Sequence, residues 1–142
     1  MAAQNFRNHS RMHPFYHYGL MPLSLGGLVF SGIQLFNCGQ NNCTSSILFF
    51  LTFLLLFGAI ALVRIYALKV QDRVIRSEEN FRHFLLTGKP LDAKLRSGQI
   101  IALRFASDAE FPVLAQRAVS ENLTAKQIKE SIQDWRADYR RV

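Results

Sequence analysis

Two long stretches of the chain contain no charged residue and consist mainly of apolar side chains. They run from 18 to 36 and from 45 to 63. At roughly 1.5 Å per residue, a helix of that length matches the roughly 30 Å hydrocarbon core of a bilayer. The pattern predicts an all-α membrane protein with two transmembrane helices, which we place at 18–36 and 45–66.

The distribution of positive charge predicts how these helices are oriented. The connecting loop at 37–44 carries no charge. The basic residues that flank the outer ends of the two stretches are Arg7, Arg11, Arg64, Lys69, Arg73 and Arg76. Because segments rich in Lys and Arg stay in the cytoplasm, we expect a transmembrane hairpin with both termini on that side. The loop would then be periplasmic, and the segments 1–17 and 67–142 cytoplasmic.

Nothing breaks the second helix where the apolar stretch ends. We therefore expect it to extend into the cytoplasm as far as Thr87, where Gly88 can adopt a left-handed conformation and Pro90 prevents resumption. The extension carries a mostly apolar stripe at helical spacing, which we expect the C-terminal helices to cover: Ala67, Val70, Val74, Ser77, Phe81 and Phe84.

Three short helices are predicted in the small C-terminal domain. The first covers 98–106. The second begins with a capping box from Ser107 to Glu110, and the third with a capping box from Thr124 to Gln127. The third helix would place one apolar face toward the extended second helix, with Ile128, Ile132, Trp135 and Tyr139 at helical spacing.

Charge and motifs narrow the functional classes. The chain has a formal net charge of +7, which fits the proximity of anionic lipid. We expect Arg64 and Lys69 to anchor the second span at the headgroups. The basic residues are mixed with acidic ones on several helices, so nucleic-acid binding is not expected. No phosphate-binding glycine loop, nucleophile elbow or zinc-protease helix is present, and we do not expect an enzyme.

Several side chains are candidates for packing or ligand binding. Small and polar residues form one stripe of the first span and predict a helix-packing face: Ser24, Gly27, Ser31 and Gln34. Three histidines spaced four apart are candidate cofactor ligands: His9, His13 and His17. The aromatic residues beside them favour interfacial anchoring instead, and we expect no bound cofactor or metal. Cys38 and Cys43 could form a disulfide or remain free thiols, and both alternatives stay open at this point.

Four segments are similar to a known family. They are NFRNHSRMHPFYH, YALKVQDRVIRSEENFRHFLLTG, QIIALRFASDAEFPVL and DWRADYRRV. They resemble a family of small bacterial two-span membrane proteins of unknown function. The resemblance covers nearly the whole chain. It implies a bacterial inner-membrane location and adds no activity.

These observations favour an accessory or scaffolding subunit that docks on a larger inner-membrane complex. Arg73, Arg76, Trp135 and Tyr139 are the candidate partner-binding residues, because arginine and aromatic side chains dominate protein interfaces. One alternative is a homo-oligomeric channel or transporter-like assembly whose first spans line a path. The other is a redox or pigment-binding subunit that holds a cofactor with the N-terminal histidines.

Overall fold

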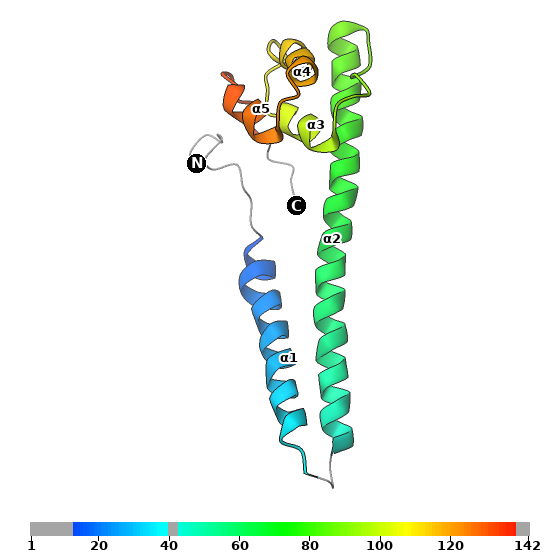
Figure 1. Cartoon of the computed structure of the whole chain (residues 1–142), viewed down its shortest axis with the longest axis vertical. Coiled ribbons are helices and arrows are strands. Elements are labelled where there is room, and N and C mark those ends of the chain that lie inside the picture. Colours follow the sequence, from blue (N-terminus) through cyan, green and yellow to red (C-terminus); the bar gives the residue numbers. More distant parts are fainter. Residues whose placement is uncertain (1–12, 40–42, 139–142) are drawn as a thin grey trace. The chain divides into compact units, whose positions relative to one another are not determined.

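The computed structural model describes residues 13–39 and 43–138, and every regular element in these ranges is a helix (Figure 1). The chain divides into two compact units, one within 12–68 and the other within 69–142. We call the described parts the apolar unit (13–68) and the C-terminal unit (69–138). One long helix, α2 at Cys43–Thr87, contributes its first part to the apolar unit and its second part to the C-terminal unit.

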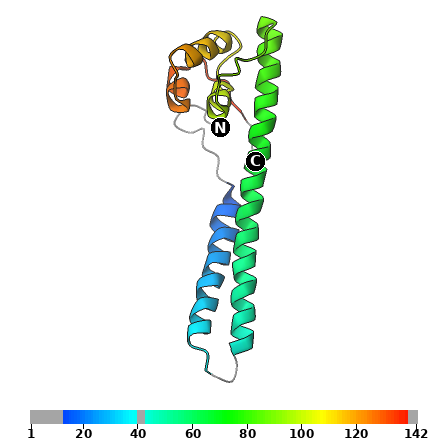
Figure 2. The same cartoon turned by 45° about the vertical axis from the view of Figure 1, so that its right-hand side comes forward.

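The apolar unit consists of two helical segments. The first begins with a π-helical turn, η1 at Phe15–Leu20, and continues as α1 at Met21–Phe36. It therefore starts before the predicted position 18. Pro14 precedes its first turn, and Pro22 lies just after η1, where the Met21 N–H donates to the Tyr16 carbonyl. In both views α1 lies beside the first part of α2 (Figures 1 and 2).

Two glycines of α1 leave room for aromatic rings of α2. A Cβ at Gly27 would overlap the ring of Phe53, and a Cβ at Gly32 would lie 3.7 Å from the ring of Phe50. At the other end of the same pair, the Tyr16 hydroxyl donates to the Ile60 carbonyl at 3.4 Å. The contact is thus built from aromatic rings on α2 that rest on the glycine-bearing face of α1.

Burial in the apolar unit is the reverse of that in a water-soluble domain. Its two buried residues are Ser24 and Ser31, whereas Leu23 and Leu55 are 76% and 72% exposed. Each serine hydroxyl donates to a carbonyl three residues earlier, so its polar group is satisfied within the helix. Both helices are long and apolar enough to cross a membrane, and their outer surface is suited to lipid.

The C-terminal unit packs three short helices and the second part of α2 around a closed core. The helices are α3 at Ser97–Leu103, α4 at Phe111–Ser120 and α5 at Ala125–Ser131. The largest fully buried side chains are Leu103, Phe105, Phe111 and Ile128. The buried Gln99 side chain donates to the Leu123 carbonyl at 2.8 Å and joins α3 to the turn before α5.

Local signals define several helix ends. Gly88 follows α2 with φ 71°, and its N–H donates to the Phe84 carbonyl. The Thr124 hydroxyl accepts the Gln127 N–H and the Gln127 side chain accepts the Thr124 N–H, which is the predicted capping box of α5. Both predictions are confirmed, because each depends on contacts within a few residues.

The predicted third helix is too long. The structure ends α5 at Ser131, and Ile132 is already extended. Trp135 instead pairs through its backbone with Ala106, and its ring stacks on Phe105 at 4.6 Å between centroids. The backbone hydrogen bonds of this bridge and the aromatic stack replace the helical path that the apolar periodicity predicted.

The capping box predicted at Ser107 is wrong as well. Helix α4 begins at Phe111, and the Ser107 hydroxyl is buried and caps nothing. The Glu110 carboxylate accepts the backbone N–H groups of Gln133 and Asp134. A long-range contact therefore uses the acceptor that a local capping box would have used.

The apolar stripe of α2 is not covered as predicted. Val70, Val74, Phe81 and Phe84 are all exposed. The face of α2 that the C-terminal helices cover contains Ile75, Glu79 and His83, which are the buried residues of this helix. Specific polar contacts, described below, hold the small helices on this other face.

Candidate functional site

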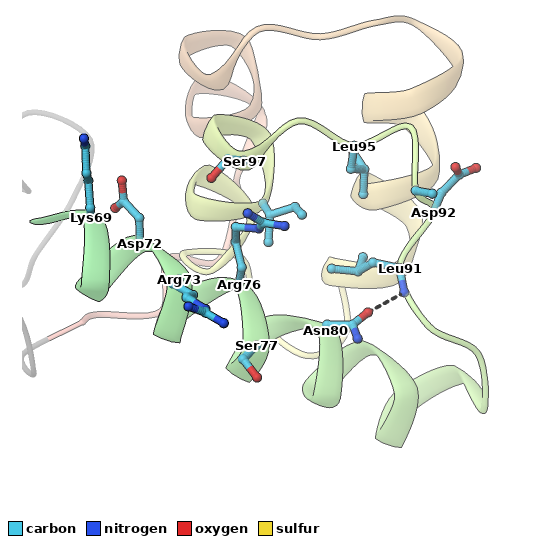
Figure 3. A pocket seen from close by; sticks show the side chains of 12 residues that line it. Lys69, Asp72, Arg73, Arg76, Ser77, Asn80, Leu91, Asp92, Leu95 and Ser97 are labelled. Atoms are coloured by element: carbon cyan, nitrogen blue, oxygen red, sulfur yellow. Dashed lines mark hydrogen bonds between the residues drawn. The ribbon is translucent and has the colours of Figure 1, made fainter.

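A groove of about 830 Å³ lies within the C-terminal unit, between α2 and the segment that leads into α3 (Figure 3). Three basic residues of α2 line it at i, i+4 and i+7: Lys69, Arg73 and Arg76. This spacing places them along one side of the helix. Two carboxylates, Asp72 and Asp92, also line the groove, so basic groups outnumber acidic ones.

The opposite wall is apolar at its base. Leu91, Leu95 and Ile100 line the groove together with the hydroxyl-bearing Ser97. Leu95 and Ile100 are buried and belong to the core of the unit. The groove therefore combines a basic wall with an apolar base, a combination that suits a segment carrying both acidic and apolar side chains.

A hydrogen bond links the wall opposite α2 to that helix. After Gly88 the chain turns back, and the Leu91 N–H donates to the Asn80 side-chain oxygen at 2.9 Å (Figure 3). The Lys94 N–H donates to the Asp92 carboxylate at 2.8 Å and shapes the turn before α3. Sequence reasoning found the basic wall but missed this opposite wall, because nothing local in 91–100 indicates what it faces. The turn signal at Gly88 and Pro90 was the available hint.

A salt-bridge network around Arg82 holds the small helices on α2. Its guanidinium contacts the Glu79 carboxylate at 2.9 Å and the Asp108 carboxylate at 2.6 Å. It also donates to the Ala106 carbonyl at 2.8 Å and lies 4.6 Å from the ring centre of Phe111. The pairing of Arg82 with Glu78 that helical spacing favours is replaced by these contacts. Glu79 is buried, whereas Asp108 is exposed and reaches the guanidinium from the segment before α4.

His83 completes this attachment. Its Nδ1 lies 2.8 Å from the Lys89 carbonyl, and its ring packs edge-on against Phe111. The Thr87 hydroxyl donates to the His83 carbonyl at 2.8 Å. A buried histidine with a backbone partner and an aromatic neighbour has a structural role here, and it fixes the turn that leads into the groove wall.

The N-terminal histidines are only partly visible. His9 lies outside the described residues. His13 and His17 are one turn apart, and the His17 Nδ1 lies 3.0 Å from the His13 carbonyl. No group of three or more His, Cys, Asp or Glu side chains in the described ranges could hold a metal ion.

The small-residue stripe of α1 is divided by the structure. Ser24 and Ser31 are buried and Gly27 lies against Phe53, whereas Gln34 is exposed. The first three residues therefore share the face that meets α2. Gln34 lies near the end of α1, outside this contact.

The remaining candidates are placed as follows. Cys38 and Cys43 are joined by a disulfide at the connection between α1 and α2. The Arg64 guanidinium lies 5.6 Å from the ring centre of Tyr16. Trp135 is half-buried on Phe105, and Tyr139 lies outside the described residues. Of the four predicted partner-binding residues, the groove contains Arg73 and Arg76.

Comparison with known proteins identifies a family without adding an activity. The model of a family of unknown function, DUF6526, matches residues 1–142, and the chain belongs to this family. Searches of curated proteins and of solved structures found no match.

Proposed function

We propose that this family member is a non-catalytic accessory subunit of a larger membrane complex, and that its groove binds an acidic segment of a partner protein. The groove carries the proposal. Arg73 and Arg76 are exposed on its basic wall, and Leu91 provides apolar surface opposite them. A partner segment with one or two carboxylates and an apolar anchor would complement both walls.

We place the groove in the cytoplasm of a bacterium, beside the inner membrane. The exposed leucine and phenylalanine side chains of the apolar unit support a two-span hairpin in lipid. The uncharged loop and the basic residues outside both spans support cytoplasmic termini. Arg64 and Lys69 then lie at the anionic headgroups, where each basic residue contributes about 1 kcal/mol.

The two alternative functions have less support. A pore would use the stripe of Ser24, Gly27 and Ser31, but Phe53 of the same chain already occupies that face. A redox or pigment-binding role would need the N-terminal histidines, and His17 makes a contact within its own helix. The docking proposal uses the groove beside Arg73 and Arg76, which no side chain of the described residues occupies.

The decisive experiment compares partners retained by charge-reversed variants. A tagged chain carrying Arg73→Glu and Arg76→Glu would be purified in mild detergent, and its partners quantified by isotope-labelled mass spectrometry. We expect a defined set of membrane proteins to be lost from this variant. Lys126→Glu is the matched control, because Lys126 is a surface cation on α5 and does not line the groove.

A second pair of variants separates docking from insertion. Replacing Arg64 and Lys69 with glutamate should disturb topology, which fusions of reporter proteins to the C-terminus would reveal. Because Lys69 also lines the groove, this variant is compared by topology and not by partner retention. The groove variant should keep the wild-type topology. Recovery of the wild-type chain without any partner, or equal retention of partners by the groove and control variants, would refute the proposal.

A further inference from the structure

A row of exposed apolar side chains follows α2 through its most highly charged part. Val70, Val74, Phe81 and Phe84 are 62%, 49%, 62% and 50% exposed. The small polar Ser77 lies in the middle of the row and is also exposed. We call these five residues the α2 seam. Two exposed phenylalanines on one row are unusual for a helix in water and indicate a surface that is covered in the assembled protein.

The spacing of the seam is that of a coiled coil. Successive members are separated by four, three, four and three residues, which is a repeat of seven residues in two turns. The same spacing continues backward in the sequence to Ala67 and Val63. A repeat of 3.5 residues keeps a row facing one partner helix when the two helices supercoil to the left.

The C-terminal unit buries no residue of this row, and Ser77 lies where the row borders the groove. Ile75, Glu79 and His83, which are the buried residues of α2, fall at other heptad positions, on the opposite side of the helix. A second helix could therefore lie on the seam without displacing α3, α4 or α5.

The charges that flank the seam favour a second copy of this chain as the occupant. With Val74 and Phe81 at positions a and Val70, Ser77 and Phe84 at positions d, Arg73 takes position g and Glu78 position e. In a parallel pair, a residue at g faces the residue at e five positions later on the other helix. Arg73, which also lines the groove, would thus face Glu78 of the second copy, and the symmetric pair would form as well.

We propose that α2 forms a parallel two-stranded coiled coil with α2 of a second copy through the α2 seam. The parallel orientation rests on the proposed topology, because two copies inserted in the same direction present α2 in the same direction. The two Ser77 side chains then meet at the centre, and a polar residue at one core position helps to specify the register. A short seam is sufficient because anchoring in one membrane raises the effective concentration of the copies.

Cysteine cross-linking in membranes tests this pairing. In the full chain with Cys38→Ser and Cys43→Ser, one cysteine would be introduced by Val74→Cys or by Phe81→Cys. We expect both variants to form covalent dimers on mild oxidation, seen on non-reducing gels. Leu86→Cys is the matched control, because Leu86 is a 42% exposed apolar residue of the same helix on the side away from the seam.

Charge exchange tests the register. Glu78→Arg should weaken dimer formation roughly five- to thirty-fold in Val74→Cys, since two attractive pairs become repulsive. Adding Arg73→Glu should restore cross-linking, because the pairs are then formed with the charges exchanged. An antiparallel pair, or a random encounter in the membrane, would not be rescued by the exchange.

The outcomes also separate this inference from the proposed groove function. Arg76→Glu should reduce partner retention and leave cross-linking unchanged. Glu78→Arg should reduce cross-linking and leave partner retention unchanged. Equal cross-linking at Leu86 and at the seam would overturn the coiled coil. A second outcome would also overturn it. If the chains stayed monomeric, and lipid vesicles alone protected the seam cysteines from a water-soluble maleimide, the seam would lie on the membrane surface instead.

Discussion

The two units of this protein bury opposite kinds of side chain. In the C-terminal unit Leu103, Phe105 and Ile128 are fully enclosed. In the apolar unit the buried residues are two serines, while leucine, valine and phenylalanine side chains cover the outside. Both units are helical, so the difference lies in which side chains they enclose and which they expose.

This contrast shows what stabilises each unit. The C-terminal unit gains free energy by removing apolar surface from water. In the proposed bilayer, lipid tails are as apolar as leucine, so the apolar unit would gain little from such burial and would depend on the fit between its two helices. The ring of Phe53, which rests on Gly27, is part of that fit.

The largest expected effect comes from the same substitution made in both units. Leu103→Ala should destabilise the C-terminal unit by about 2 to 5 kcal/mol, because Leu103 is fully enclosed and its truncation leaves a cavity. Leu55→Ala, at a 72% exposed position of the apolar unit, should leave that transition unchanged. The fluorescence of Trp135, the only tryptophan, follows urea unfolding in detergent. Equal shifts of the urea midpoint in the two variants would contradict the difference in burial between the two units.

The next effect concerns the attachment of the small helices to α2. Arg82→Met should cost about 2 to 3 kcal/mol, because it leaves the buried Glu79 carboxylate without its partner. Arg117→Met is the control, since Arg117 pairs with Glu121 at an exposed site, where solvent screens the pair and its loss should change the free energy of unfolding far less. The same urea titration measures both. If Arg117→Met were as costly, the stability of the unit would not depend on burial of the Arg82 network.

Two adjacent glycines test the close approach in the apolar unit. Gly27→Leu should weaken the contact of α1 with α2 by about 1 to 3 kcal/mol, because the new side chain overlaps Phe53. Gly26→Leu should have little effect, since no atom lies within 4 Å of a Cβ there. Hydrogen exchange of α1 in micelles, measured by mass spectrometry, distinguishes them. Faster exchange in Gly26→Leu than in Gly27→Leu would place the contact on the wrong face.

The parts of the fold that sequence reasoning predicted correctly depend on local contacts. The end of α2 before Gly88 follows from one residue in the left-handed region, and the start of α5 follows from the capping box between Thr124 and Gln127. The two apolar helices follow from the length and composition of their segments. Each signal lies within a few residues or within one helix.

The errors arise where distant segments compete with local ones. Apolar periodicity favoured a helix through Trp135, but the backbone pairing of Trp135 with Ala106 prevailed. Apolar periodicity also favoured the Val70 and Phe81 row as the face under the small helices. Glu79, Arg82 and His83 determined the packed face instead, because their polar contacts with Asp108, Ala106 and Lys89 have no equivalent on the apolar row. The far wall of the groove was missed for the same reason.

The smallest expected effect is a response of the C-terminal unit to acid. The hydrogen bond from Arg117 lowers the pKa of Glu121 below its ordinary value of 4.5. A carboxyl with a lowered pKa in the folded state stabilises the fold above its unfolded pKa, and this contribution is lost as pH falls from about 4.5 through the lower folded value. Because the pair is fully exposed, salt should screen the effect.

In Glu121→Gln the urea midpoint should therefore fall less steeply below pH 4.5 than in the wild type. Trp135 fluorescence at low ionic strength measures this midpoint. Glu130→Gln is a comparison on α5, where Lys126 is 3.8 Å away. The apolar unit contains no Asp or Glu, since the first acidic residue of the chain is Asp72. Hydrogen exchange of α1 should accordingly show no acid-induced opening over the same range, once the intrinsic exchange rate is corrected for pH. An opening of α1 in parallel with the C-terminal unit would show that the two units unfold together.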